Sequence, residues 1–270
     1  MKDQFSDVEI QKVNTIIQDF RSGKYHQGIV ELRKLNKFIY DSIPPNLRIS
    51  RGITWVMQRI SNLIQAGSNG DCDTWLIACC IRENLEVTDH LSGVPIFLMG
   101  SFGKKHPCEV FPFFESIADA DDWVIREFAQ GSFRQVIKPN VDIVLLWLTQ
   151  MAVAASPNLR RFASETLRPV TTNRWIFEQP EASLSVLRLL FREPHPYPRT
   201  SVGNNLSDLS RRLPEMIFSV VQELMDMKDE NSTWIAYRAC RNLVKKDPPR
   251  VLDGLSINEY HYKDRNFYRE

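Results

Sequence analysis

One motif recurs four times in the second half of the chain. Its copies are WVIREFAQGSF, PNLRRFASETL, PYPRTSVGNNL and the weaker TWIAYRACRNL, at residues 123–133, 157–167, 196–206 and 233–243. Each copy has a small or β-branched residue followed four positions later by a larger apolar one, a spacing that places both on one face of a helix. The pairs are Ala129 with Phe133, Ala163 with Leu167, Val202 with Leu206, and Ala239 with Leu243.

Another apolar helical segment follows each copy, such as residues 141–153 or 214–225. A unit of two helices that recurs every 34 to 39 residues resembles the HEAT-repeat pattern. Such a unit cannot bury its apolar face alone, so neighbouring units must stack. The sequence therefore predicts an all-α fold, a right-handed α-solenoid of HEAT-like helical repeats with a concave groove lined by the second helices.

The first half also reads as helices joined by short loops. A capping box formed by Ser6 and Glu9 predicts the first helix start, and Pro44 ends the second helix. Val8, Val13, Ile16, Ile17 and Phe20 form the expected core stripe of that first helix. We expect one HEAT-like domain over 1–270, with N-terminal helices in 1–120, recognisable repeats in 121–250 and a C-terminal tail in 251–270.

Composition excludes several classes of protein. A net charge of +1 argues against a general polyanion binder, and the longest apolar run, 141–155, is too short to span a bilayer. The five cysteines fit buried free thiols, and the five scattered histidines form no metal constellation, so we expect no metal and no cofactor. The polar N-terminus carries no signal peptide, so we expect a cytoplasmic protein with no membrane partner.

The charge is distributed unevenly. Residues 158–212 hold nine arginines, no lysine and five acidic residues, and arginine favours bidentate contacts with carboxylates or phosphates. In three motif copies an arginine precedes the small residue by three positions, at Arg126, Arg160 and Arg199. In stacked repeats such an arginine can join neighbouring repeats, and on a concave surface it can contact phosphates. Different arginines of this set can have different roles.

Residues 196–210 form a helix whose polar face is either solvated or bound to a ligand. Val202, Leu206 and Leu209 form an apolar stripe continued by Leu213, and the opposite side collects Ser201, Asn204, Asp208 and Arg211. A polar helix face is usually a solvated face. Glu165 occupies the repeat position of Asn204, however, and a polar position repeated on adjacent helices is what a ligand groove requires.

Two stretches of the sequence resemble the DNA alkylation repair family of HEAT-like glycosylases, which has AlkC-like and AlkD-like branches. The AlkC-like motif N-x-x-V-R-R-x-x-S-E-G-x-R-P matches NLRRFASETLRP, and Y-V-R-R-S-V-A-N-x-L-x-D-I matches YPRTSVGNNLSDL. The resemblance covers about residues 121–250. The chain departs from the motifs at Thr166 and Thr200, and its segment from Arg168 to Trp175 is two residues longer than in the family.

This resemblance implies a glycosylase that excises positively charged alkylated purines, of the 3-methyladenine and 7-methylguanine type, from double-stranded DNA. A carboxylate would stabilise the cationic sugar, and aromatic faces would attract the cationic base or sugar. We expect catalytic roles for Asp208, Asp122, Trp175 and Trp123, and DNA contacts from Arg160, Arg161, Arg168, Arg199, Asn204 and Arg211. We expect a monomer. The alternative is a non-catalytic HEAT-like module that binds DNA or a protein.

Overall fold

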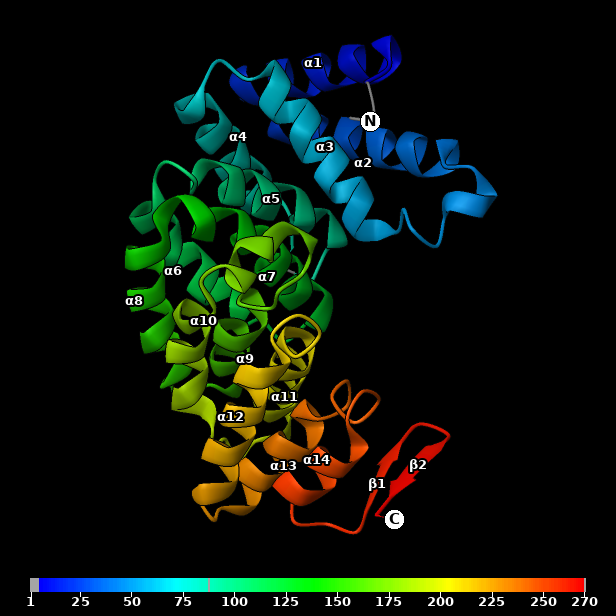
Figure 1. The fold of residues 1–270 in the computed structure, drawn as a ribbon. Helices are drawn as coiled ribbons and strands as arrows, with labels where there is room; N and C mark the ends of the chain where they lie inside the picture. Colours follow the sequence, from blue (N-terminus) through cyan, green and yellow to red (C-terminus); the bar gives the residue numbers. More distant parts are fainter. Residues whose placement is uncertain (1–4, 87, 270) are drawn as a thin grey trace. The chain divides into compact units, whose positions relative to one another are not determined.

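The computed structural model describes residues 5–86 and 88–269, and in them the chain is almost entirely helical (Figure 1). Within those residues the sheet consists of one two-stranded antiparallel hairpin. The expected all-α helical-repeat class is therefore confirmed. The chain divides into two compact units, Met1–Asn140 and Val141–Glu270, whereas we expected one domain over 1–270 with recognisable repeats from residue 121.

The first unit holds seven α-helices in its described residues. They are α1 (Asp7–Arg21), α2 (Tyr25–Ser42), α3 (Ile53–Gly67), α4 (Asp71–Glu83), α5 (Gly93–Phe102), α6 (Pro107–Ala118) and α7 (Trp123–Ile137). Short 3-10 helices lie between or after them, namely η1 (Pro45–Leu47), η2 (His90–Ser92) and η3 (Lys138–Asn140).

Local signals set the ends of the first helices. The expected capping box is present, because the Glu9 amide donates to Ser6 Oγ and the Ser6 amide donates to a Glu9 carboxylate oxygen at 2.8 Å. Helix α2 ends at Ser42, and its C-cap Ile43 directly precedes Pro44 and Pro45. Val8 is 47 % exposed, so its place in the core stripe was wrongly predicted. In the first turn of α1 it is Glu9 that faces the core, where it is 5 % exposed and pairs with Arg59 of α3 at 2.5 Å.

Helix α5 is the centre of the first unit. It packs against α3, α4 and α7, and nine of its ten residues are buried. The approach to α7 is close, because Ser132 Oγ donates to the Ile96 carbonyl at 2.7 Å and a Cβ added at Gly100 would lie 2.1 Å from that same hydroxyl oxygen. Glycine at position 100 is therefore what allows α5 and α7 to approach so closely.

The second unit contains the remaining helices and the hairpin. Its α-helices are α8 (Val141–Ala152), α9 (Pro157–Thr166), α10 (Pro180–Leu187), α11 (Pro196–Leu209), α12 (Pro214–Asp226), α13 (Glu230–Ala239) and α14 (Pro248–Gly254). Two 3-10 helices, η4 (Thr171–Phe177) and η5 (Arg188–Leu190), precede and follow α10, and the strands are β1 (Glu259–Tyr262) and β2 (Arg265–Tyr268).

Three motif helices of this unit form a row in which α9 packs against α11 and α11 packs against α13. Helices α8, α10 and α12 make the second layer. The small and large apolar residues of all four motif copies are at most 1 % exposed, as the repeat pattern predicted. The apolar run 141–155 was expected to be a buried helix, but Leu146 on α8 is 65 % exposed because only one side of this outer helix meets a neighbour.

The segment expected to be a C-terminal tail has regular structure in its described residues. Helix α14 packs against α12, and the β1–β2 hairpin follows it. Tyr260 of β1 is fully buried, its ring stacks on Tyr237 at 4.1 Å between centroids, and its hydroxyl donates to the Tyr237 carbonyl at 2.6 Å. The hairpin is therefore anchored to α13.

The cysteines were expected to be buried thiols, but this is wrong for two of them. Cys72 and Cys108 are exposed and only Cys240 is fully buried. Across residues 5–86 and 88–269, no helix has the length and apolar character needed to cross a membrane. No group of three metal-ligating side chains comes together in that part of the chain either.

Candidate nucleic-acid interface

The polar side predicted for α11 is only partly accessible: Ser201 is buried, Asn204 and Asp208 are half-buried, and Arg211 is exposed. Ser201, Asn205 and Ser207 are at most 1 % exposed, because α9 and α13 cover this helix from both sides. The Ser201 hydroxyl donates to Glu165, and the Asn205 amide donates to the Ser164 carbonyl at 2.9 Å. These groups join neighbouring repeats. At the edge of the row of α9, α11 and α13, the charged side chains of Arg168, Asp208 and Arg211 stay accessible.

A carboxylate and arginine network links α9 to α11. Arg168 donates to a Glu165 oxygen at 2.7 Å and to Asp208 Oδ2 at 2.6 Å, so it bridges the two acids. The other Glu165 oxygen accepts the Ser201 hydroxyl at 2.6 Å. Asp208 Oδ1 has a longer contact with Arg211, at 3.3 Å. Glu165 is 3 % exposed while the Asp208 side chain keeps 20 %, so only the second acid is accessible to a ligand.

The charges in this network stabilise one another. Burial opposes ionisation of Glu165, but the charge of Arg168, the Ser201 hydroxyl and Arg161 outweigh it and hold the pKa of Glu165 below its ordinary value. Burial likewise disfavours the Arg168 guanidinium, and the two acids overcome this and raise its pKa. Glu165 is therefore a permanent anion at neutral pH, and it positions Arg168 against Asp208.

A second cluster lies where α11 meets α13, and it is purely cationic. Asn204 Oδ1 accepts from Arg238 Nε at 3.0 Å and from Arg241 Nη2 at 2.5 Å. The guanidinium carbon atoms of Arg238 and Arg199 lie 5.3 and 4.7 Å from the centroid of the Trp234 ring. Arg199 also donates to Asn231. In the part of the chain that the structure describes, none of these three arginines has a carboxylate within 4.0 Å.

The missing carboxylate has an electrostatic consequence. Burial and the neighbouring Arg241 charge lower the pKa of Arg238, while the more distant Tyr260 and Tyr262 act in the opposite direction. Arginine does not lose its proton in proteins, so Arg238 and Arg241 both stay positively charged and repel each other. An anion beside Asn204 would relieve this repulsion. We call Arg199, Arg238 and Arg241, with Asn204 and Trp234, the arginine cluster.

Two of the three repeated arginines, Arg126 and Arg160, are engaged within the stack of repeats. Arg126 donates to the carbonyls of Ala120 and Asp121, six and five residues before it. Arg160 makes the equivalent bonds to Ala154 and Ala155 and a bidentate pair with Glu193 at 2.7 and 2.9 Å. Those bonds occupy four of its five N–H groups. The expected DNA contact of Arg160 is therefore at odds with its geometry, because Glu193 and the loop carbonyls take its donors.

The other expected DNA-binding residues lie along the row. The Arg161 guanidinium carbon lies 4.3 Å from the centroid of the Tyr197 ring, and its Nη2 lies 3.8 Å from Glu165. Arg211 is the most accessible, with 66 % of its side chain exposed. Arg168 belongs to the carboxylate network, while Arg199 and Asn204 belong to the arginine cluster. Five of the six expected residues therefore line the edge of α9, α11 and the turn after α11.

Trp175 does not present the exposed aromatic face that was predicted. It is 7 % exposed and lies in η4. The Asn173 amide donates to the Thr166 carbonyl at 2.6 Å and to the Arg168 carbonyl at 3.2 Å, which folds the loop back onto the end of α9. The Trp175 ring thereby turns inward. The Asn173 amide therefore satisfies two carbonyl groups at the end of α9.

Asp122 and Trp123 belong to the first unit. Asp122 is the N-cap of α7, where its Oδ1 accepts the Val124 amide at 2.7 Å, and its Oδ2 lies 3.7 Å from His90 Nε2. Trp123 is 65 % exposed, and its contact with a ligand stays a prediction. The capping bond gives Asp122 a structural role. Asp208 lies in the second unit, so no catalytic pairing of these two acids follows from the structure.

The sequence interpretation missed Arg238 and Arg241. Both lie in the fourth motif copy, which was judged weaker because Ala236 stands where the other copies have arginine. A signal was nevertheless present. The repeat position that holds Glu165 and Asn204 in consecutive copies holds Arg241 in the fourth, and Arg238 corresponds to Ser201.

No known protein-family model matches the sequence. The chain is 25 % identical over 144 residues to the uncharacterized protein YhaZ of Bacillus subtilis strain 168, a match that spans 51 % of this chain and 40 % of that protein. The structure is similar to that of AlkD2 from Streptococcus mutans, with a TM-score of 0.47 and 17 % identity, over 70 % of this chain and 98 % of the other.

It is also similar to the Pseudomonas fluorescens alkylpurine DNA glycosylase AlkC bound to DNA containing an abasic site analog. That likeness has a TM-score of 0.56 and 18 % identity, and it covers 93 % of this chain and 67 % of the other. At this identity the likeness concerns the fold. The chain thus shares the fold of this AlkC structure, as the AlkC-like motifs in residues 157–210 predicted.

Proposed function

We propose that this chain binds double-stranded DNA along the edge of α9, α11 and α13 and excises positively charged alkylated purines by hydrolysing the N-glycosidic bond. The observation that carries the proposal is an accessible carboxylate, Asp208, one helical turn from an arginine cluster that no carboxylate neutralises. The similarity in fold to a DNA-bound alkylpurine glycosylase supports the same assignment.

The arginine cluster supplies the phosphate contacts. Guanidinium groups match the geometry of phosphate oxygens, and each phosphate that is neutralised releases counterions from the duplex. Arg238 and Arg241 share the single acceptor Asn204, so both keep N–H groups available for a phosphodiester. We therefore place the strongest backbone contact beside Asn204, with Arg211 as a weaker, exposed contact.

Asp208 supplies the chemistry. Alkylation at N3 or N7 gives the purine a positive charge, and cleavage of its bond to C1′ moves the bonding electron pair onto the base and neutralises it. The sugar then carries the positive charge until a water molecule adds to C1′ and loses a proton. A carboxylate beside the sugar stabilises that cation more than the neutral ground state. Because Oδ2 binds Arg168, Oδ1 is the oxygen that we assign to face the sugar.

A second candidate function rests on the same network. Arg168 and Arg211 both pair with Asp208 and offset its negative charge, which favours a module that binds DNA without cleaving it. The two functions share the DNA-binding surface and differ in base release alone.

The DNA-binding part is tested by the salt dependence of affinity for a duplex. Arg238→Gln and Arg241→Gln should each weaken binding and each reduce the slope of log K against log salt by about 1. Arg250→Gln is the matched control, because Arg250 lies on α14 and already pairs with Glu215 at 2.8 Å. If the two cluster variants keep the wild-type slope, phosphates do not bind at the arginine cluster.

A further inference from the structure

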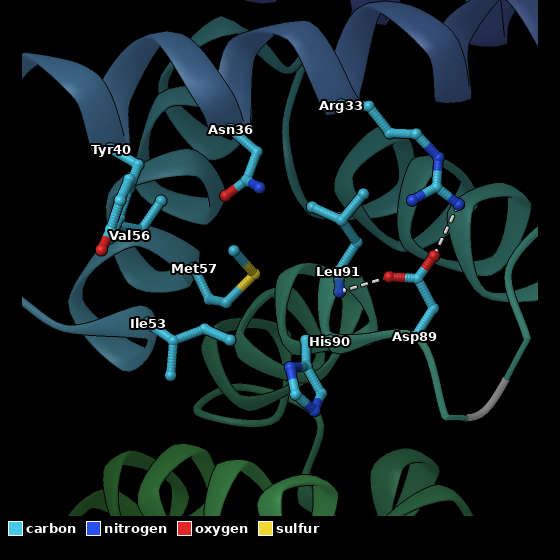
Figure 2. A pocket seen from close by; sticks show the side chains of 9 residues that line it. All are labelled: Arg33, Asn36, Tyr40, Ile53, Val56, Met57, Asp89, His90 and Leu91. Atoms are coloured by element: carbon cyan, nitrogen blue, oxygen red, sulfur yellow. Dashed lines mark hydrogen bonds and ion pairs between the residues drawn. The ribbon is translucent and has the colours of Figure 1, made fainter.

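The first unit contains a cavity of about 360 Å³ between α2, α3 and η2, and no role proposed above uses it (Figure 2). Its size falls in the range of roughly 300–1,000 Å³ that is usual for small-molecule pockets. Val56, Met57 and Leu91 form its apolar floor and are at most 4 % exposed. The exposed side chains of Tyr40 and Ile53 line the cavity and leave it open to solvent.

One polar group points into this cavity without a partner. Asn36 projects from α2 toward Met57 in Figure 2, and among the described residues its half-buried amide has no hydrogen-bond partner. An amide that is held over an apolar floor offers one donor and one acceptor side by side. That pair matches the edge of adenine, as in the bidentate contact of asparagine with adenine N6 and N7.

The charged residues at the rim are already neutralised. Asp89 accepts from Arg33 at 2.6 Å and from the Leu91 amide at 2.9 Å, so both of its oxygens are engaged. His90 Nε2 lies 3.7 Å from Asp122, outside the cavity floor. A rim that carries balanced charge does not select a phosphate. The cavity is therefore suited to an uncharged ring, which the apolar floor and the Tyr40 ring would hold by stacking and dispersion.

From this geometry we propose that the cavity between α2, α3 and η2 binds a purine base, with Asn36 reading the base edge. The base enters either as a free nucleoside or as an unpaired base of a DNA strand. This binding does not depend on the arginine cluster or on Asp208, which lie in the second unit.

The test is isothermal titration calorimetry of the full chain with adenosine and, in parallel, with cytidine. We expect saturable binding of adenosine and weaker binding of cytidine. Asn36→Leu removes the donor and acceptor and should weaken adenosine binding about tenfold or more. Ile53→Trp fills the cavity from its exposed edge and should abolish binding. Leu76→Trp adds the same ring at a 61 % exposed site on α4 and should leave adenosine binding unchanged.

A second arm distinguishes the two sources of the base. A DNA hairpin with one unpaired adenine is compared with the same hairpin fully paired. A preference for the unpaired adenine that Asn36→Leu removes supports the proposal with DNA as the source, whereas Asn36-dependent binding of adenosine supports it with the free nucleoside. The proposal is overturned if neither probe binds in an Asn36-dependent way, if cytidine binds as well as adenosine, or if Ile53→Trp binds adenosine like the wild type.

Discussion

Removing the negative charge of Glu165 should destabilise the second unit strongly. Glu165 is 3 % exposed and its two oxygens contact Arg168 and Ser201 at 2.7 and 2.6 Å. Glu165→Gln keeps the shape and the bond with Ser201 but leaves Arg168 with only Asp208 as a counter-charge. Breaking one partner of a buried ion pair typically costs 3–5 kcal/mol.

We expect a loss of about 3 kcal/mol, near the lower end of that range, because Arg168 keeps its contact with Asp208. With a slope of about 3 kcal/mol per molar urea, the unfolding midpoint should fall by about 1 M. The assay is urea unfolding followed by circular dichroism. Glu215→Gln is the matched control, since Glu215 forms an equally short ion pair with Arg250 but its side chain is 76 % exposed.

The control variant should keep a midpoint close to that of the wild type, because solvent screens an exposed pair. If Glu165→Gln shifts the midpoint no further than Glu215→Gln does, the buried charge network does not hold α9 against α11. The positioning of Asp208 by Arg168 would then lose its structural basis.

A pH series and two glycine substitutions test the Glu165 network, the α5–α7 packing and the arginine cluster in turn. The folded state lowers the pKa of Glu165, so the ionised side chain stabilises the fold above its ordinary pKa of 4.5, and this stabilisation is lost as the pH falls through the lower pKa of the folded state. The melting temperature should therefore fall between pH 7 and pH 3, and Glu165→Gln should make that fall smaller. Gly100→Ala places a Cβ 2.1 Å from Ser132 Oγ, so it should lower stability by about 1–3 kcal/mol or more in urea unfolding, and wild-type stability would contradict the tight α5–α7 packing. Gly203→Ala places a Cβ 2.9 Å from Arg238, so it should shift that side chain and weaken duplex binding, and unchanged affinity would argue against Arg238 as a phosphate contact.

The repeat architecture was readable from the sequence because its signal is local. Positions four residues apart, such as Ala163 and Leu167, share one face of a helix whatever surrounds that helix, and both are buried as predicted. The capping box at Ser6 is equally local, and it too is present. Such signals depend on neighbours within one turn of the chain.

The site residues were harder to predict because their surroundings come from distant parts of the chain. Ser201 looked solvent-exposed on a single helix, but α9 brings Glu165 to it across 36 positions. Trp175 is buried because the Asn173 amide bonds hold its loop against the end of α9, a contact that the sequence of the loop does not reveal. The arginine cluster could not be seen either, because composition shows how many acids are present and not which arginines they reach.

The central claim is most directly tested by single-turnover release of 7-methylguanine or 3-methyladenine from methylated duplex DNA, with duplex affinity measured in parallel. The wild type should release the base, and Asp208→Asn should slow release about 10²–10³-fold while duplex affinity changes little. Asp226→Asn, at an exposed position near the end of α12, should behave like the wild type. Release by Asp208→Asn at the wild-type rate would contradict the role of Asp208, and a wild-type protein that binds DNA but releases no base would contradict the glycosylase assignment.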